Sequence, residues 1–193
     1  MRTKIRRAIL GAAPPARSED PAPGRNDRSA KCCGCGEEFP GDDGPTHPYV
    51  LSSPGCWKAY GDLLAREYQD QSYWPVHRLT VDSYAVQHPG VDTPQARNSV
   101  GIHLSRLCLM LEMAWPMQRV NGAMEEITAR KSEYPWLTPP AFLGDVTVRH
   151  VLAARNASEH ADEVERWARS VWAAWAGQHA AVREWVGTLS RLR

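Results

Sequence analysis

The sequence has little lysine and almost no net charge. Its 193 residues carry a formal net charge of +1, and only four of the 23 basic residues are lysine. A protein that binds nucleic acid by neutralising phosphates needs an excess of basic residues, so we expect no nucleic-acid partner. No apolar run approaches the roughly 20 residues of a membrane-spanning helix, so we expect no membrane association either.

The signatures of the commonest enzyme classes are also missing. The chain has no Gly-rich phosphate loop, no dinucleotide-binding fingerprint, no GxSxG elbow and no HExxH pattern. No alternating strand pattern of any length appears. Candidate functional groups must therefore be sought among clusters of cysteine, histidine and tyrosine on a helical framework.

The first 30 residues differ in composition from the rest. Proline, glycine, serine, arginine and aspartate dominate residues 1–30, which predicts a disordered tail. The only apolar stretch there, residues 8–13, is shorter than a secretion-signal core and is followed at once by prolines, so we expect a cytoplasmic protein. Residues 31–193 are predicted to form a single domain, divided into a small lobe over 31–57 and a helical bundle over 58–193.

The small lobe contains a set of metal-binding side chains. Cys32 and Cys35 form a C-x-x-C knuckle, His47 follows after eleven intervening residues, and Cys56 follows after a further eight. Three thiolates and one imidazole are a complete tetrahedral ligand set for zinc, with no open coordination position. The sequence therefore predicts a structural zinc ion bound by these four residues.

The position of Cys56 supports this interpretation. A Ser-Pro pair at 53–54 is typical of a helix start, which places Cys56 in the first helical turn, where the thiolate form is favoured. Cys33 could replace Cys32 as the first ligand. Disulfides and a redox pair are alternative interpretations, although a cytoplasmic chain disfavours disulfides and no strand–helix pattern surrounds the knuckle.

The remainder of the chain predicts one helix after another. The apolar spacing, caps and prolines place helices over 56–69, 75–88, 94–115, 116–131 and 147–154, and a last helix from about 157 to 189 unless Gly177 bends it. The last helix has an apolar stripe that runs from Val164 to Val186. The fold class that follows is mainly α, a helical bundle with a small N-terminal zinc-knuckle lobe.

A second group of side chains suggests a polar pocket. On the predicted second helix, His77, Tyr84 and His88 share one face. Because a short loop joins this helix to the next, we expect Tyr84 and His88 to face His103, with His77 or His179 at the margin. Histidine can act as a general acid or base near neutral pH, and tyrosine can donate a proton.

The same side chains also have structural interpretations. His88 lies at a helix C-terminus, where an imidazolium complements the helix dipole, and His77 and Tyr84 could simply pack in the core. A second metal site that combines one of these histidines with another helix is a further alternative. His150 and His160 are expected to be exposed at the surface.

Several blocks of the sequence resemble a known family. The blocks are the C-x-x-C knuckle, GPTHPYVLSSPGCW, VHRLTVDSYAVQHPG, YPWLTPP and VWAAWA, which together extend over most of residues 32–187. They resemble an actinobacterial family known only as a domain of unknown function. The resemblance implies a bacterial origin and one coherent domain, and it implies no established reaction.

Two classes of function remain open at the level of sequence. The first is a small metabolic enzyme, in specialised metabolism, whose histidine- and tyrosine-lined pocket acts on a small-molecule substrate by acid–base chemistry. The second is a non-catalytic, zinc-stabilised module that binds a ligand or a protein partner. Convergence of the histidines on one concave pocket would favour the enzyme.

Overall fold

The computed structural model describes residues 29–190 and begins with a short hairpin. Strand β1 (Ser29–Lys31) pairs in antiparallel fashion with β2 (Glu38–Pro40). Each strand has three residues, which is too short for an alternating pattern to stand out in the sequence. The predicted tail over residues 1–30 lies outside the described residues, except for its last two, which belong to β1.

The remaining secondary-structure elements of the described chain are all helical, as predicted. The helices are α1 (Pro54–Gln69), α2 (His77–Gln87), α3 (Pro94–Leu107), α4 (Met117–Ala129), α5 (Val148–Leu152), α6 (Ala157–Ala174) and α7 (His179–Ser190). Shorter turns join them: 3₁₀ helices η1 (Gln71–Val76), η3 (Lys131–Glu133) and η4 (Ala176–Gln178), and a π turn η2 (Cys108–Glu112). Within the described residues, no helix combines the length and apolar character needed to cross a bilayer.

Local signals set most of the helix starts. The side chains of Ser53, Thr93 and Asn156 each accept a hydrogen bond from a backbone N–H of the first turn that follows them. Pro54 and Pro94 then occupy the first helical position, where their missing N–H has no cost. The predicted starts of these three helices are therefore confirmed.

The predicted last helix is interrupted. The backbone leaves α-helical geometry at Trp175, passes through η4, and resumes as α7. The predicted apolar stripe nevertheless stays buried on both sides of this break, from Val164 in α6 to Val186 in α7. The break therefore changes the direction of the helix, and the apolar stripe continues on both sides of it.

Helix α6 is held against α2 by polar groups as well as by apolar packing. The indole nitrogen of Trp167 donates to the Gln87 side chain at 2.9 Å, and that of Trp175 donates to the Val86 carbonyl at 3.0 Å. Both indoles are fully buried, and their N–H groups are satisfied, as burial requires. Gln87 also donates to two carbonyls of the loop that precedes α5.

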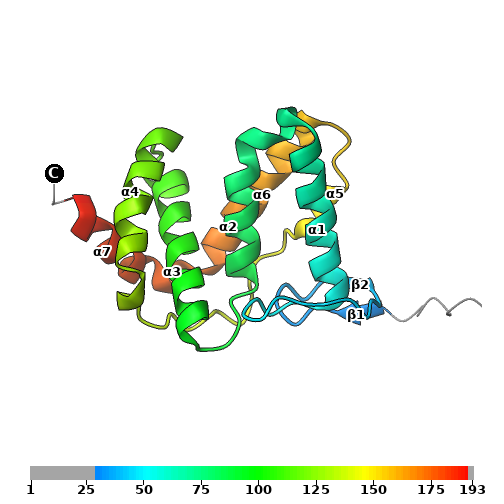
Figure 1. Ribbon diagram of the computed structural model, residues 1–193, viewed down its shortest axis with the longest axis horizontal. Helices are drawn as coiled ribbons and strands as arrows, with labels where there is room; N and C mark the ends of the chain where they lie inside the picture. The colour runs from blue at the N-terminus through cyan, green and yellow to red at the C-terminus, as the bar shows by residue number, and fades with distance from the viewer. Residues whose placement is uncertain (1–28, 191–193) are drawn as a thin grey trace, which may run out of the picture.

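The arrangement of the helices places the N-terminal lobe at one end of a helix pair. In Figure 1, α1 and α2 stand next to each other, α6 crosses behind α2, and α3, α4 and α7 form the other side of the bundle. The β1–β2 hairpin lies at the end where α1 begins and α2 ends (Figure 1). The Cys32–Cys35 knuckle of the lobe is therefore close to the first turn of α1 and the last turn of α2.

Candidate metal centre

Four potential metal ligands meet where the lobe contacts α1 and α2. The ligand atoms of Cys32, Cys35, Cys56 and His88 all lie within 4.8 Å of one another. The Cys35 and Cys56 sulfurs are 3.9 Å apart, and the His88 Nε2 atom is 3.4 Å from the Cys56 sulfur. Three of the four residues are buried, and Cys35 is half-buried. The cluster could hold a metal ion.

The knuckle that carries the first two cysteines depends on glycine. A Cβ atom at Gly34 would lie 2.4 Å from the His88 ring and 2.6 Å from the Leu51 carbonyl oxygen, so the backbone approaches closely because no side chain is present. Gly36 has a φ of +75°, in the left-handed region that favours glycine. The two glycines thus bring the knuckle against the end of α2.

Cys56 reaches the cluster from the first turn of α1. Its backbone N–H donates to the Ser53 hydroxyl at 3.3 Å, which is the helix cap predicted from the sequence. The Ser53 N–H in turn donates to the Cys32 sulfur at 3.5 Å. The cap therefore orders the helix start and one thiol of the knuckle together.

The electrostatics of the thiols favour a bound cation. Hydrogen bonding to Cys32 and Cys35, together with burial, raises the pKa of Cys56. Hydrogen bonding to Cys32 raises the pKa of Cys35 to about 12. Hydrogen bonds from its two thiol neighbours lower the pKa of Cys32. The three sulfurs thus share their protons through hydrogen bonds, and a divalent cation would replace those protons and allow all three sulfurs to ionise.

His88 is oriented for coordination by its second nitrogen. Its Nδ1 is 2.8 Å from the Tyr84 carbonyl oxygen, so Nδ1–H donates to that carbonyl and Nε2 is left facing Cys56. Metal-bound histidines commonly make this kind of second contact. The Tyr84 hydroxyl donates to the Cys56 sulfur at 3.6 Å, and its ring stacks on Tyr60 at 3.8 Å.

The histidine of the cluster is not the one predicted from the sequence. The structure does not bring His47 to the thiols, because its ring contacts Tyr49 at 4.3 Å and Trp57 at 5.2 Å between centroids. His88, expected in a separate pocket, belongs to the cluster instead. Cys33 is exposed, whereas Cys32 is buried and belongs to the cluster. The first cysteine of the cluster is therefore Cys32, which the C-x-x-C spacing favoured over Cys33.

The residues predicted to share a pocket are dispersed. His77, Tyr84 and His88 do lie on one face of α2, but that face meets α1 and not α3. His103 of α3 pairs at 2.6 Å with Asp82, which projects from another face of α2. His179 stacks on the Trp172 ring, with centroids 3.8 Å apart. The expected pairing of Tyr84 with His103 is therefore replaced by two separate sets of contacts.

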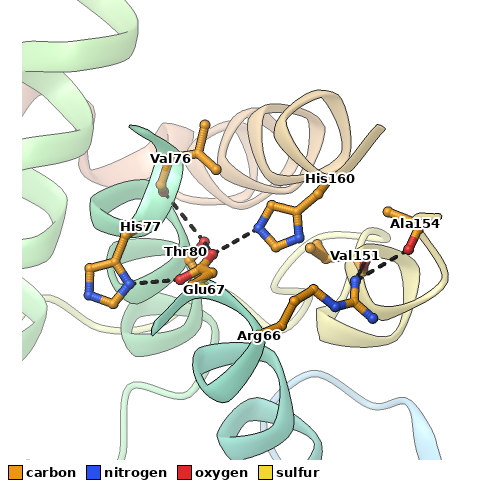
Figure 2. Close-up of polar contacts among 8 residues, drawn as sticks. All are labelled: Arg66, Glu67, Val76, His77, Thr80, Val151, Ala154 and His160. Atoms are coloured by element: carbon orange, nitrogen blue, oxygen red, sulfur yellow. Dashed lines mark hydrogen bonds and ion pairs between the residues drawn. The ribbon is translucent and has the colours of Figure 1, made fainter. Parts of the chain in front are cut away.

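A buried network surrounds Glu67, and no pattern in the sequence indicated it. Figure 2 shows this carboxylate between two histidine rings, near the C-terminal end of α1. It accepts hydrogen bonds from His77 Nδ1 at 2.7 Å, His160 Nε2 at 2.9 Å and the Thr80 hydroxyl at 2.5 Å.

The expectation that His160 is exposed is wrong: its side chain is completely buried against this carboxylate, because α6 crosses α2 at this level. His150 is exposed, as predicted.

A pocket lies beside this network. It has a volume of about 520 Å³ and is lined by Glu67, Tyr68, Gln71, Trp74 and Pro75. The aromatic rings of Tyr68 and Trp74 form contacts with His77 and with each other, at centroid distances of 4.4–5.2 Å. His77 is 5% exposed and lies directly beneath these two rings.

The comparison with protein families identifies the chain. The model described as a family of unknown function (DUF5946) matches residues 30–176, which include helices α1 to α6. The chain therefore belongs to this family, in agreement with the resemblance noted in the sequence. Comparisons with curated proteins and with solved structures gave no match.

Proposed function

We propose that the protein binds one zinc ion through Cys32, Cys35, Cys56 and His88, and that this ion is structural. The observation that carries the proposal is the closed set of four ligand atoms within 4.8 Å of one another. Three soft thiolates and one imidazole suit a tetrahedral zinc ion and do not suit the oxygen-seeking cations magnesium and calcium. All four positions would come from the protein, so none remains for a substrate.

The proposed zinc connects parts of the chain that are far apart in sequence. Cys32 and Cys35 belong to the lobe, Cys56 to the first turn of α1, and His88 to the end of α2. The two strands of the lobe are only three residues long, so the metal would supply much of what keeps the lobe folded.

Metal analysis of purified variants tests this proposal. We expect one zinc per chain in the wild type, and loss of zinc with a lower melting temperature in Cys56→Ser and His88→Ala. The matched controls are Cys33→Ser and His47→Ala, which should retain the metal because neither residue belongs to the cluster. Absence of zinc from the wild type, or loss of zinc in His47→Ala but not in His88→Ala, would contradict the assignment.

We also propose that the protein is an enzyme that acts on a small molecule by acid–base chemistry, with His77 as the base. The supporting observation is the 2.7 Å contact between His77 Nδ1 and the buried Glu67 carboxylate, beside the pocket at Tyr68 and Trp74. A carboxylate on one imidazole nitrogen fixes the tautomer and stabilises the imidazolium that forms when the other nitrogen takes a proton.

The alternative function is that of a non-catalytic binding module. Hydrolysis of a generic activated ester distinguishes an acid–base enzyme from such a module. We expect the protein to accelerate release of 4-nitrophenolate from 4-nitrophenyl acetate, and His77→Gln to reduce this rate roughly tenfold or more. His150→Gln, at an exposed histidine, is the control and should retain the wild-type rate. An unchanged rate in His77→Gln would reject the acid–base function and leave the binding module.

A further inference from the structure

Tyr68 extends the Glu67–His77 pair toward solvent. The Tyr68 hydroxyl is 3.5 Å from His77 Nε2, and His77 Nδ1 is 2.7 Å from the Glu67 carboxylate. Successive contacts thus join a fully buried carboxylate, an imidazole and a tyrosine that is 66% exposed. Contacts of this kind are commonly long in the absence of a ligand.

The hydrogen bonds determine the direction in which the protons point. Burial by itself would raise the pKa of Glu67, but the hydrogen bonds that it accepts outweigh this effect and the pKa is lowered. An ionised carboxylate can only accept, so His77 must donate through Nδ1–H. In the neutral ring Nε2 then has no proton and accepts the hydrogen bond from the Tyr68 hydroxyl.

We propose that Tyr68 is the catalytic residue that meets the substrate, that His77 takes its proton, and that Glu67 is the positioning residue that holds the imidazole. The proposal rests on the acid–base function proposed above and changes which atom touches the substrate. Tyr68 lines the pocket itself, whereas His77 is not among its lining residues and contacts two of them, Tyr68 and Trp74. A hydroxyl, a base and a third group that orients the base are the arrangement that activates side-chain nucleophiles in general.

The lining of the pocket points to a class of substrate. Its five lining residues include two aromatic rings, a proline and an amide, and none of them is Lys, Arg or His. A phosphate or carboxylate would find no cationic partner among these residues and would face the negative charge of Glu67. Trp74 is 47% exposed and offers a flat apolar surface. We infer an uncharged, ring-bearing carbonyl compound.

N-acetylimidazole provides a direct test, because it acetylates activated tyrosines. The experiment therefore does not require the substrate to be known. The Tyr68 oxygen would attack the acetyl carbon while its proton passes to His77 Nε2. The bond from the acetyl carbon to the reagent nitrogen then breaks, and imidazole leaves with the proton from His77. The product is O-acetyl-Tyr68, which peptide mass spectrometry locates in the full-length, zinc-loaded protein.

Tyr49 serves as an internal control, since it is also exposed, at 38%. Exposure alone would make Tyr68 about twofold faster, whereas activation by His77 should make it roughly tenfold faster or more. His77→Gln should reduce the Tyr68 rate to that of Tyr49, and His150→Gln should leave it unchanged. A Tyr68 rate within about twofold of the Tyr49 rate, or no effect of His77→Gln, would overturn the proposal.

Two further measurements separate this inference from the function on which it rests. If His77→Gln loses 4-nitrophenyl acetate hydrolysis while Tyr68→Phe retains it, then His77 acts directly and the role of Tyr68 is refuted. If both variants lose the activity, Tyr68 is supported. For the substrate class, benzamide should slow acetylation of Tyr68, and benzoate, of similar shape but negatively charged, should not. Equal protection by benzoate would overturn the inference of an uncharged substrate.

Discussion

Replacement of Glu67 by alanine should lower the free energy of unfolding by about 3–5 kcal/mol. The carboxylate is completely buried and accepts hydrogen bonds from three buried side chains: His77, His160 and Thr80. A hydrogen bond to a charged group contributes about 1.5–3 kcal/mol, but the variant also avoids the cost of burying the charge, so the net loss is smaller than the sum. For a protein of this size the loss corresponds to a decrease in melting temperature of roughly 10–15 °C.

The same carboxylate should produce a specific pH dependence. Its pKa in the folded protein lies below its ordinary value of 4.5, because the hydrogen bonds from the histidines and the threonine outweigh the effect of burial. An acid whose pKa is lowered on folding stabilises the fold above its unfolded pKa, and this contribution disappears as the pH falls through the folded value. The difference in unfolding free energy between the wild type and Glu67→Gln should therefore shrink below pH 4.5.

Urea unfolding followed by circular dichroism, on Glu67→Ala at pH 7 and on Glu67→Gln at pH 7 and at several values below 4.5, measures both effects. Loss in acid of the metal proposed above would affect the wild type and the variant alike, so the difference between them isolates Glu67. The control is Glu165→Gln, at an exposed ion pair with Arg169, which should change stability by less than about 1 kcal/mol. If Glu67→Gln matches this control at pH 7, or if its deficit stays constant at lower pH, the network does not stabilise the fold as argued.

Three substitutions test the packing elsewhere by the same unfolding assay. Arg66 donates to three backbone carbonyls at the end of α5, so Arg66→Met should lower the free energy of unfolding by about 2–3 kcal/mol. An unchanged free energy would show that water satisfies these carbonyls equally well. Asn156 caps α6, so Asn156→Ala should cost about 1 kcal/mol, and a neutral result would show that this cap is dispensable. A Cβ at Gly101 would lie 2.3 Å from the Tyr134 ring, so Gly101→Ala should destabilise by about 1–3 kcal/mol. The control is Gly61→Ala, which has open space around the added Cβ and should stabilise the protein by up to about 1 kcal/mol. Equal effects of the two glycine substitutions would refute the clash with Tyr134.

The parts of the fold that could be predicted are those encoded locally. Helix starts are set by a capping side chain and a proline within a few residues, so Ser53, Thr93 and Asn156 mark them in the sequence. The apolar stripe of the last helix is likewise a local periodicity. The β1–β2 hairpin gave no such signal, because strands of three residues are too short to show alternation, and its formation depends on the glycine turn between them.

The three cysteines of the candidate metal cluster could be predicted from the sequence, and its histidine could not. Ligand spacing along the chain favours the histidine nearest the cysteines, and His47 satisfies that criterion. The residue that reaches the cluster is His88, 32 residues beyond Cys56 and at the end of the next long helix. Its selection depends on how α1 and α2 pack, which is a tertiary property. Glu67 was missed for a related reason, since a single glutamate in a helix is normally exposed and only packing by α2 and α6 buries it.

One geometric relation connects the metal cluster with the Glu67 network. The contacting pairs Cys56–His88, Tyr60–Tyr84 and Glu67–His77 are each placed symmetrically about Ser72, in the turn between α1 and α2. The two helices thus keep one antiparallel register over their whole length, with the metal cluster at one end and the carboxylate network at the other. Once this register is known, the partner of Cys56 is His88 and the partner of Glu67 is His77. The sequence did not reveal it, because the short α2–α3 loop made α3 the expected neighbour of the histidine face. The buried charge of Asp82 instead faces α3, where His103 and Arg106 compensate it, and this leaves the histidine face of α2 to pack against α1.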